Sequence, residues 1–214
     1  MEVEEGASSQ AQIEKKKCEE LIPLYPCDLR NLKNSLKNFV QKKLFKWDQK
    51  HQGIVLQCKN IKKSSEKASI HDESPVIFVP CSYRLKVLQI KQGDVFLGQV
   101  TQTFNTHISL QLFGLFNVLI YADDISDKIL KLNDDSEWVD AKENTVIEVS
   151  DDIQFEVKTV DLQEFGDFML IGSLKNTKKN GPYSSIKDKY KVMDHTKIQE
   201  LVEKSLSKYS NLKE

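Results

Sequence analysis

The segment from residue 107 to residue 120, HISLQLFGLFNVLI, constrains the fold of this chain more than any other. Apolar and polar residues alternate on both sides of Gly114, over residues 108–112 and again over residues 116–120. An alternation of period two is typical of strands with one buried face, and a glycine between two such runs marks a break in the strand. We expect this break to let one strand leave its sheet and wrap, as happens in a small β-barrel.

Three further runs of the same kind complete a set of five strands. They cover residues 94–104, 153–160 and 168–174, and Gly98 lies inside the first of them, as glycines do at barrel bends. Five short strands with one long connection predict an oligonucleotide-binding (OB) barrel, which is a five-stranded Greek-key form. We expect the long connection to carry a variable insert.

A second module precedes the barrel. Apolar residues recur at helical spacing from Leu29 to Trp47, and Asp28 is placed to cap the expected helix. After Gly53 the period changes to that of strands, with one run at 54–61 and one or two more between 75 and 88. A helix packed on a small sheet makes an α+β module. The predicted fold class is therefore α+β, with a small N-terminal α+β domain followed by an all-β five-stranded OB barrel.

The expected organisation has four parts. They are a flexible acidic tail at 1–20, an N-terminal α+β domain at 21–89, an OB domain at 90–175 with an insert at 122–151, and a lysine-rich linker with a short amphipathic helix at 176–214. No run approaches the roughly 20 apolar residues that span a bilayer, and the acidic N-terminus does not have the composition of a signal peptide. We expect an intracellular protein with no membrane partner.

Catalytic and metal-binding motifs are missing from the sequence. The four cysteines form no C-x-x-C pair and the four histidines are scattered, so tetrahedral zinc has no paired ligands. There is no Gly-rich phosphate loop, no Gly-x-Ser-x-Gly elbow and no His-Glu-x-x-His helix. We expect no catalytic residue, no metal and no cofactor, and we interpret the aspartate doublets at 123–124, 134–135 and 151–152 as solvated loop charge.

Charge is distributed in blocks although the net charge is only −1. Residues 29–67 carry 11 basic and 2 acidic groups, whereas residues 123–167 carry 15 acidic and 4 basic groups. Such blocks indicate partners of both signs, and solvated faces without a partner are the alternative. Because the acidic block repels phosphate, we expect no more than a weak RNA contact on the barrel, near Lys91, Gln102, Asn105 and His107.

Several motifs in this order resemble the larger stalk subunit of eukaryotic RNA polymerase I. They are Leu24-Tyr-Pro-x-x-Leu29, Gly53-Ile-Val-Leu, Asn60-Ile-Lys62, Gly93-Asp-Val-Phe-Leu-Gly-Gln-Val100, His107-Ile-Ser, Gly114-Leu-Phe-Asn117, Glu137-Trp-Val-Asp140 and Gly172-Ser-Leu-Lys175. The related stalk subunits of RNA polymerases II and III and of archaeal RNA polymerase share the two-domain plan. His107-Ile-Ser and Phe116-Asn117 favour the polymerase I version, and polymerase III is the alternative within this class.

The resemblance implies a non-catalytic subunit whose N-terminal domain is of a truncated RNP-like type. It implies docking on the polymerase I core through that domain, pairing with a smaller stalk subunit, recruitment of the polymerase I initiation factor and contact with the nascent RNA, in the nucleus and nucleolus. Candidates for the core-docking or partner interface are Arg30, Lys33, Lys37, Gly53, Asn60, Ile61 and Lys62. A free-standing OB-fold RNA-binding factor remains the alternative from another function class.

Overall fold

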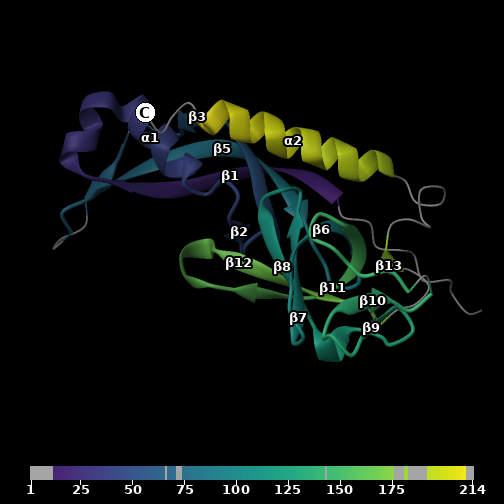
Figure 1. The fold of residues 1–214 in the computed structure, drawn as a ribbon. Coiled ribbons are helices and arrows are strands. Elements are labelled where there is room, and N and C mark those ends of the chain that lie inside the picture. Colours follow the sequence, from purple (N-terminus) through teal and green to yellow (C-terminus); the bar gives the residue numbers. More distant parts are fainter. Residues whose placement is uncertain are drawn as a thin grey trace, which may run out of the picture. The chain divides into compact units, whose positions relative to one another are not determined.

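The computed structural model describes residues 12–65, 67–70, 74–142, 144–175, 181–182 and 192–210. These residues form two compact units, Gln12–Gln89 and a second unit that begins at Ile90. Figure 1 draws the first unit in purple and blue and the second in teal, green and yellow. Residues 1–11 of the expected tail, and residues 176–180 and 183–191 of the expected linker, lie outside the described residues.

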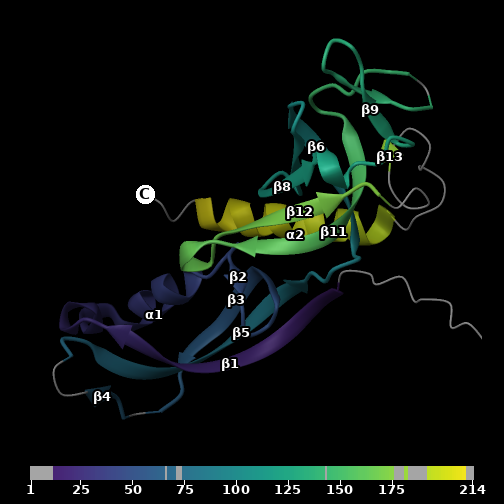
Figure 2. The ribbon, with the colours of Figure 1, turned by 90° about the horizontal axis from the view of Figure 1, so that it is seen from below.

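The N-terminal unit is an antiparallel sheet with one α-helix. The strand order is β1-β5-β3-β2, and β4 also pairs with β5, so β1 is an edge strand and β5 is central (Figure 2). The elements are β1 (Gln12–Leu24), the 3-10 helix η1 (Pro26–Asn31), α1 (Leu32–Gln41), β2 (Trp47–Asp48), β3 (Gly53–Lys63), β4 (Ser69–Ile70) and β5 (Ile77–Gln89).

The core of this unit lies between α1 and one face of the sheet. Leu36 and Val40 of α1 are buried, and Leu32 and Phe39 are partly buried against the same core. Spacings of three and four residues place these side chains on one side of the helix, as predicted. The predicted α+β class of the N-terminal domain is confirmed. The sheet contributes Cys18, Ile22, Leu24, Val55, Cys58, Val79, Cys81, Tyr83, Leu85 and Val87.

The helix is shorter than the apolar pattern predicted. Asn31, not Asp28, is its N-cap, and its side-chain oxygen accepts the backbone N–H of Asn34 at 3.5 Å. The carboxylate of Asp28 instead accepts the backbone N–H of Tyr25 at 3.0 Å, inside the 3-10 turn that precedes α1. Trp47, expected on the helix, lies in β2, because the chain has already turned away after α1 ends.

The expectation of a flexible tail over residues 1–20 is wrong for its second half. All thirteen residues of β1, from Gln12 to Leu24, pair in register with β5. The pairing satisfies backbone hydrogen bonds along a charged segment whose composition alone suggests a tail. Cys18, Ile22 and Leu24 bury one face of the strand, which stabilises the pairing.

The second unit contains the predicted barrel. Its strands are β6 (Val95–Thr103), β7 (His107–Leu112), β8 (Phe116–Tyr121), β11 (Asp152–Leu162) and β12 (Phe168–Ser173). The path β6-β7-β8-β12-β11 closes because β11 also pairs with β6, and β12 runs parallel to β8 while the other pairs are antiparallel. This order is that of a five-stranded Greek-key barrel, so the predicted OB fold is confirmed.

We expected a strand to leave its sheet at Gly114, and this expectation is wrong, because Gly114 lies in a hairpin turn. Phe113 and Gly114 both have positive φ, of 53° and 66°, and Leu115 donates its backbone N–H to the Leu112 carbonyl at 3.1 Å. Positive φ at both central residues is what a tight hairpin turn requires. The hairpin joins β7 to β8 directly. Gly98, by contrast, lies in the wall of the barrel, where a Cβ would be 3.1 Å from the Phe155 ring.

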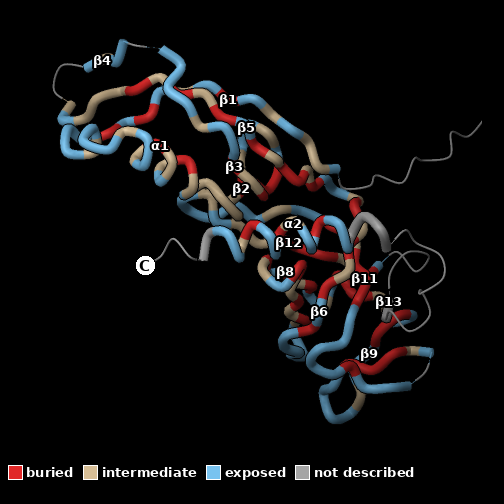
Figure 3. The backbone as a smooth tube through the Cα atoms, turned by 90° about the horizontal axis from the view of Figure 1, so that it is seen from above, coloured by how far each residue is buried: buried red, intermediate tan, exposed pale blue. Residues whose placement is uncertain are grey.

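Figure 3 shows the buried residues of the barrel strands in red. In β7 and β8 they alternate with less buried residues, whereas β11 and β12 each contain three consecutive buried residues. Phe96 and Phe116 lie in the barrel core, since only 5% and 4% of these residues are exposed. The expected insert has structure of its own. It contains the 3-10 helix η2 (Ala122–Asp124) and a two-stranded sheet of β9 (Leu130–Leu132) and β10 (Trp138–Asp140).

The remaining elements follow β11. The 3-10 helix η3 (Glu164–Gly166) joins β11 to β12, and β13 (Gly181–Pro182) adds to β11. The amphipathic helix expected within residues 176–214 is α2 (Val192–Ser210), and Ile198 and Val202 are buried on one side of it. Among the described residues no helix has the length and hydropathy of a membrane span.

Candidate docking and nucleic-acid interfaces

Three of the candidate docking cations lie on the helical segment of the N-terminal unit. Lys33 is exposed and Lys37 is half-buried in α1, and Arg30 is exposed in the preceding η1. Residues four apart lie on the same side of a helix, so Lys33 and Lys37 are neighbours. The buried side chains of α1, which include Leu36 and Val40, form the adjoining stripe of the helix, so Lys33 and Lys37 flank that stripe. The structure therefore places a small basic surface on α1, at the border of its buried stripe.

The other candidates of this group lie on β3 and do not share that surface. Gly53 is buried, and a Cβ there would lie 2.3 Å from the Leu88 carbonyl oxygen, so its role in the fold is the close packing of β3 on β5. Ile61 is partly buried against the core on the α1 side. Asn60 and Lys62 are exposed, and the register of β3 on β5 puts Lys62 on the sheet face opposite α1.

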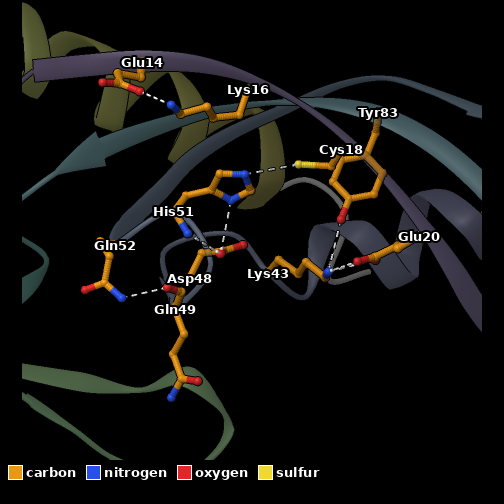
Figure 4. Close-up of polar contacts among 10 residues, drawn as sticks. All are labelled: Glu14, Lys16, Cys18, Glu20, Lys43, Asp48, Gln49, His51, Gln52 and Tyr83. Atoms are coloured by element: carbon orange, nitrogen blue, oxygen red, sulfur yellow. Dashed lines mark hydrogen bonds and ion pairs between the residues drawn. The ribbon is translucent and has the colours of Figure 1, made fainter.

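A set of polar contacts fixes the end of the helical segment on the sheet (Figure 4). The Lys43 ammonium group donates to both carboxylate oxygens of Glu20 at 2.7 Å and to the Tyr83 hydroxyl at 3.0 Å. Burial, followed by the charge of Glu20, raises the pKa of Tyr83, so its hydroxyl stays protonated. Because Glu20 lies on β1 and Tyr83 on β5, these bonds join the segment after α1 to two strands.

Cys18, His51 and Asp48 line up as thiol, imidazole and carboxylate (Figure 4). The Cys18 Sγ lies 3.9 Å from His51 Nε2, and His51 Nδ1 lies 3.2 Å from Asp48 Oδ1. Enzymes with a cysteine nucleophile arrange a thiol, an imidazole and a carboxylate in this order, but the thiol must be ionised to a thiolate to react. Burial raises the pKa of the Cys18 thiol, and only 6% of the residue is exposed. This cluster therefore supports the fold and does not have the features of a nucleophile.

Metal ligands are not gathered in the parts of the chain that the structure describes. Across those residues, no three or more His, Cys, Asp or Glu side chains are placed to hold an ion.

Three of the four RNA-contact candidates lie together at one end of the barrel. Gln102 is exposed near the end of β6, Asn105 is exposed in the turn that follows, and His107 begins β7. Lys91 precedes β6, and a strand of 9 residues spans about 30 Å. The structure therefore brings Gln102, Asn105 and His107 together and leaves Lys91 at the other end of the strand.

Two aromatic side chains that we had not included among the candidates join this end. The Phe104 ring centroid lies 4.8 Å from that of His107, and Tyr121 is the cross-strand partner of His107. Phe104 is 46% exposed and Tyr121 is 45% exposed. The indole N–H of Trp138 donates to the Phe104 carbonyl at 2.7 Å, which holds the turn in place. We call Phe104, His107 and Tyr121 the aromatic platform, because exposed rings are the surfaces on which bases stack.

The carboxylates that follow the platform are of two kinds. Asp123 is exposed, as we expected of loop charge. Asp124 is only 3% exposed, and its carboxylate lies 2.7 Å from Lys158 Nζ and 3.3 Å from Lys175 Nζ, so the interpretation as solvated charge is wrong for this residue. Burial alone would raise the pKa of Asp124, but hydrogen bonds from the two lysines hold it below its ordinary value. Asp124 therefore joins η2 to β11 through Lys158, and to the segment after β12 through Lys175.

Two comparisons with known proteins give matches to this chain. Residues 19–75 match the SHS2 domain found in the N terminus of Rpb7p/Rpc25p/MJ0397. The chain is 27% identical over 130 residues to DNA-directed RNA polymerase I subunit rpa43 of Schizosaccharomyces pombe. The aligned segment covers 58% of this chain and 74% of that protein. The predicted resemblance to the larger stalk subunit of RNA polymerase I is confirmed.

Proposed function

We propose that this chain is a non-catalytic stalk subunit of DNA-directed RNA polymerase I that acts in the initiation of rRNA synthesis. One observation carries the proposal: an SHS2-type domain and a closed OB barrel follow one another in a chain similar to a polymerase I subunit. The chain works in the nucleus and nucleolus, pairs with a smaller stalk subunit and docks on the polymerase I core. It recruits the polymerase I initiation factor and contacts the exiting transcript.

Affinity purification of the tagged full chain from its own cells, followed by mass spectrometry, tests the assignment. We expect the largest subunits of polymerase I and a small stalk partner in stoichiometric amounts. Recovery of the largest polymerase III subunits instead would move the chain to the alternative within this class. Recovery of ribosomal or RNA-processing proteins without any polymerase would favour a free-standing OB factor.

Docking on the core rests on the basic surface of α1. Lys33 and Lys37 are neighbours there, and the Glu20 and Tyr83 contacts of Lys43 hold the adjoining segment on the sheet. Charge on such a surface accelerates association and makes it dependent on salt. The variant with Lys33→Glu and Lys37→Glu should therefore join a polymerase lacking this subunit more slowly at low salt than the wild type.

A matched control carries the same charge change elsewhere. Lys128 and Lys131 are exposed in the barrel insert, so Lys128→Glu with Lys131→Glu should leave the association rate nearly unchanged. Equal rates for the α1 variant and the wild type at low salt would show that the α1 lysines are only a solvated surface.

Transcript contact rests on the aromatic platform with Gln102 and Asn105 beside it. Rings can stack with bases of any sequence, and the amide side chains can donate to a phosphate or a base edge. The acidic insert next to the platform opposes phosphate, so the affinity of the isolated chain for single-stranded RNA should be weak and should fall steeply with salt.

The same platform is the observation that favours the alternative of a free-standing RNA-binding OB factor. In that case the isolated chain should bind single-stranded RNA tightly without a polymerase. Nanomolar binding that persists at physiological salt would support this alternative over the stalk assignment.

A further inference from the structure

The sheet face of the N-terminal unit opposite α1 carries a group of cations that the proposed function does not use. The register of the three long strands places Lys86 directly opposite Lys15, and Arg84 directly between Lys17 and Lys59. Directly opposite residues share a face of the sheet, with Cβ atoms about 5 Å apart. We call these five residues the basic sheet face.

Most of this charge has no counterion within the described residues. Lys17 pairs with Glu19 at 2.7 Å. No ion pair to a described residue involves Lys15, Lys59, Arg84 or Lys86, and all of these except the half-buried Lys86 are exposed. Like charges directly opposite each other destabilise a sheet. The fold therefore carries a repulsion that an anionic partner would remove.

Protection of an exposed sheet edge does not explain the whole group. Lysines on an edge strand discourage unwanted pairing with other chains, and β1 is such a strand. Arg84 and Lys86, however, lie on β5, which has β1 on one side and β3 on the other. A central strand has no free edge to protect, so its cations need another explanation.

The face is also hollowed. A depression of about 320 Å³ opens there, and it is lined by Lys15, Gln57, Lys59, Asn60, Arg84, Leu85 and Lys86. No aromatic side chain lines it, whereas surfaces that select single-stranded RNA stack its bases on aromatic rings. The hollow therefore suits recognition of point charges, and carboxylates match the cations that surround it.

We propose that the basic sheet face binds an extended acidic segment of a partner protein. Arg84 and Lys86 are two residues apart on a strand, so their side chains project from one face about 6.6 Å apart. Acidic side chains at alternate positions of an extended segment repeat at the same interval, which allows each carboxylate to meet a cation. The residues of this face are different from the α1 lysines and from those of the aromatic platform, and the proposal does not depend on which polymerase holds the chain.

The test uses the full chain and a fluorescein-labelled peptide of about a dozen residues in which glutamate and threonine alternate. Fluorescence anisotropy at low salt should show saturable binding, and a peptide with glutamine in place of glutamate should not bind. The variant Lys59→Gln with Arg84→Gln should weaken binding by about tenfold, since two charge contacts are lost. The matched variant Lys33→Gln with Lys37→Gln removes the same charge from α1 and should change binding less than about twofold.

A second measurement, the thermal midpoint, checks that the variant is folded. Because Lys59→Gln with Arg84→Gln removes like-charge repulsion, its thermal midpoint should equal or exceed that of the wild type. Equal weakening by the two charge-matched variants would show nonspecific attraction and overturn the proposal. Absence of any binding of the glutamate peptide to the wild-type chain would also overturn the proposal. Tighter binding of an oligouridylate than of the peptide, lost with Lys59→Gln and Arg84→Gln, would reassign the face to nucleic acid.

Discussion

Gly172 lies in β12 at a point where the barrel core has no room for a side chain. A Cβ there would lie 2.8 Å from Cδ2 of Phe155 and 3.0 Å from Cγ1 of Ile120. Phe155 is fully buried, so its ring has no free space into which it can move. We predict that Gly172→Ala lowers the free energy of unfolding by about 1–3 kcal/mol, which is the usual cost of overpacking a core.

A second substitution identifies the atoms responsible. Phe155→Leu alone should cost about 1–2 kcal/mol, because it removes buried carbon atoms from the core. It also shortens the side chain that the methyl group introduced by Gly172→Ala would meet. The double variant should therefore be more stable, by at least about 1 kcal/mol, than the sum of the two single effects predicts.

Urea unfolding monitored by tryptophan fluorescence measures these differences. The chain has one tryptophan in each unit, Trp47 in β2 and Trp138 in β10. A Trp47→Phe background leaves Trp138 to report on the barrel unit. Linear extrapolation of each transition gives the four unfolding free energies of the cycle.

Gly114→Ala is the control. Gly114 has φ of 66° with no atom within 4 Å of an added Cβ, so the substitution should cost about 1–2 kcal/mol through backbone strain alone. Phe155→Leu should not relieve that cost. If the Gly172 and Phe155 effects add within about 0.5 kcal/mol, the ring is not the obstacle and the reasoning is refuted.

Three further predictions follow from the described contacts. Because the fold lowers the pKa of Asp124 from its ordinary value of 3.8, the ionised carboxylate stabilises the fold above that pH, and this stabilisation is lost as the pH falls through the lowered pKa. The variant Asp124→Asn should therefore have a lower urea midpoint than the wild type at pH 7. Its urea midpoint should also decline less than that of the wild type between about pH 5 and 3. In anisotropy titrations with a single-stranded oligouridylate, Phe104→Ala or His107→Ala should weaken binding by about tenfold, whereas Lys91→Ala, far along β6, should have a much smaller effect. Cys27 is the exposed cysteine, and the others are buried, so a thiol reagent should modify one cysteine in the folded chain and four in denaturant.

The amino-acid sequence alone determined the barrel strands and the helix. Strand residues 108–112 and 116–120 alternate with a period of two, and α1 has a period near 3.6, so each element records in its own residues which side is buried. The barrel closure followed from the number and spacing of these runs. Patterns of this kind depend only on residues that are close together in the sequence, so they can be recognised without knowledge of the tertiary structure.

Only the tertiary structure decided which distant residues share a surface. The charged residues 12–20 form a strand because β5 lies beside them, and Asp124 is buried because Lys158 and Lys175 reach it from later segments. The cations of the basic sheet face come from three strands and lie up to 71 positions apart, from Lys15 to Lys86. Strand register fixes these neighbours, and a shift of one residue would turn every side chain to the other face. Register depends on the whole sheet, which no single segment encodes.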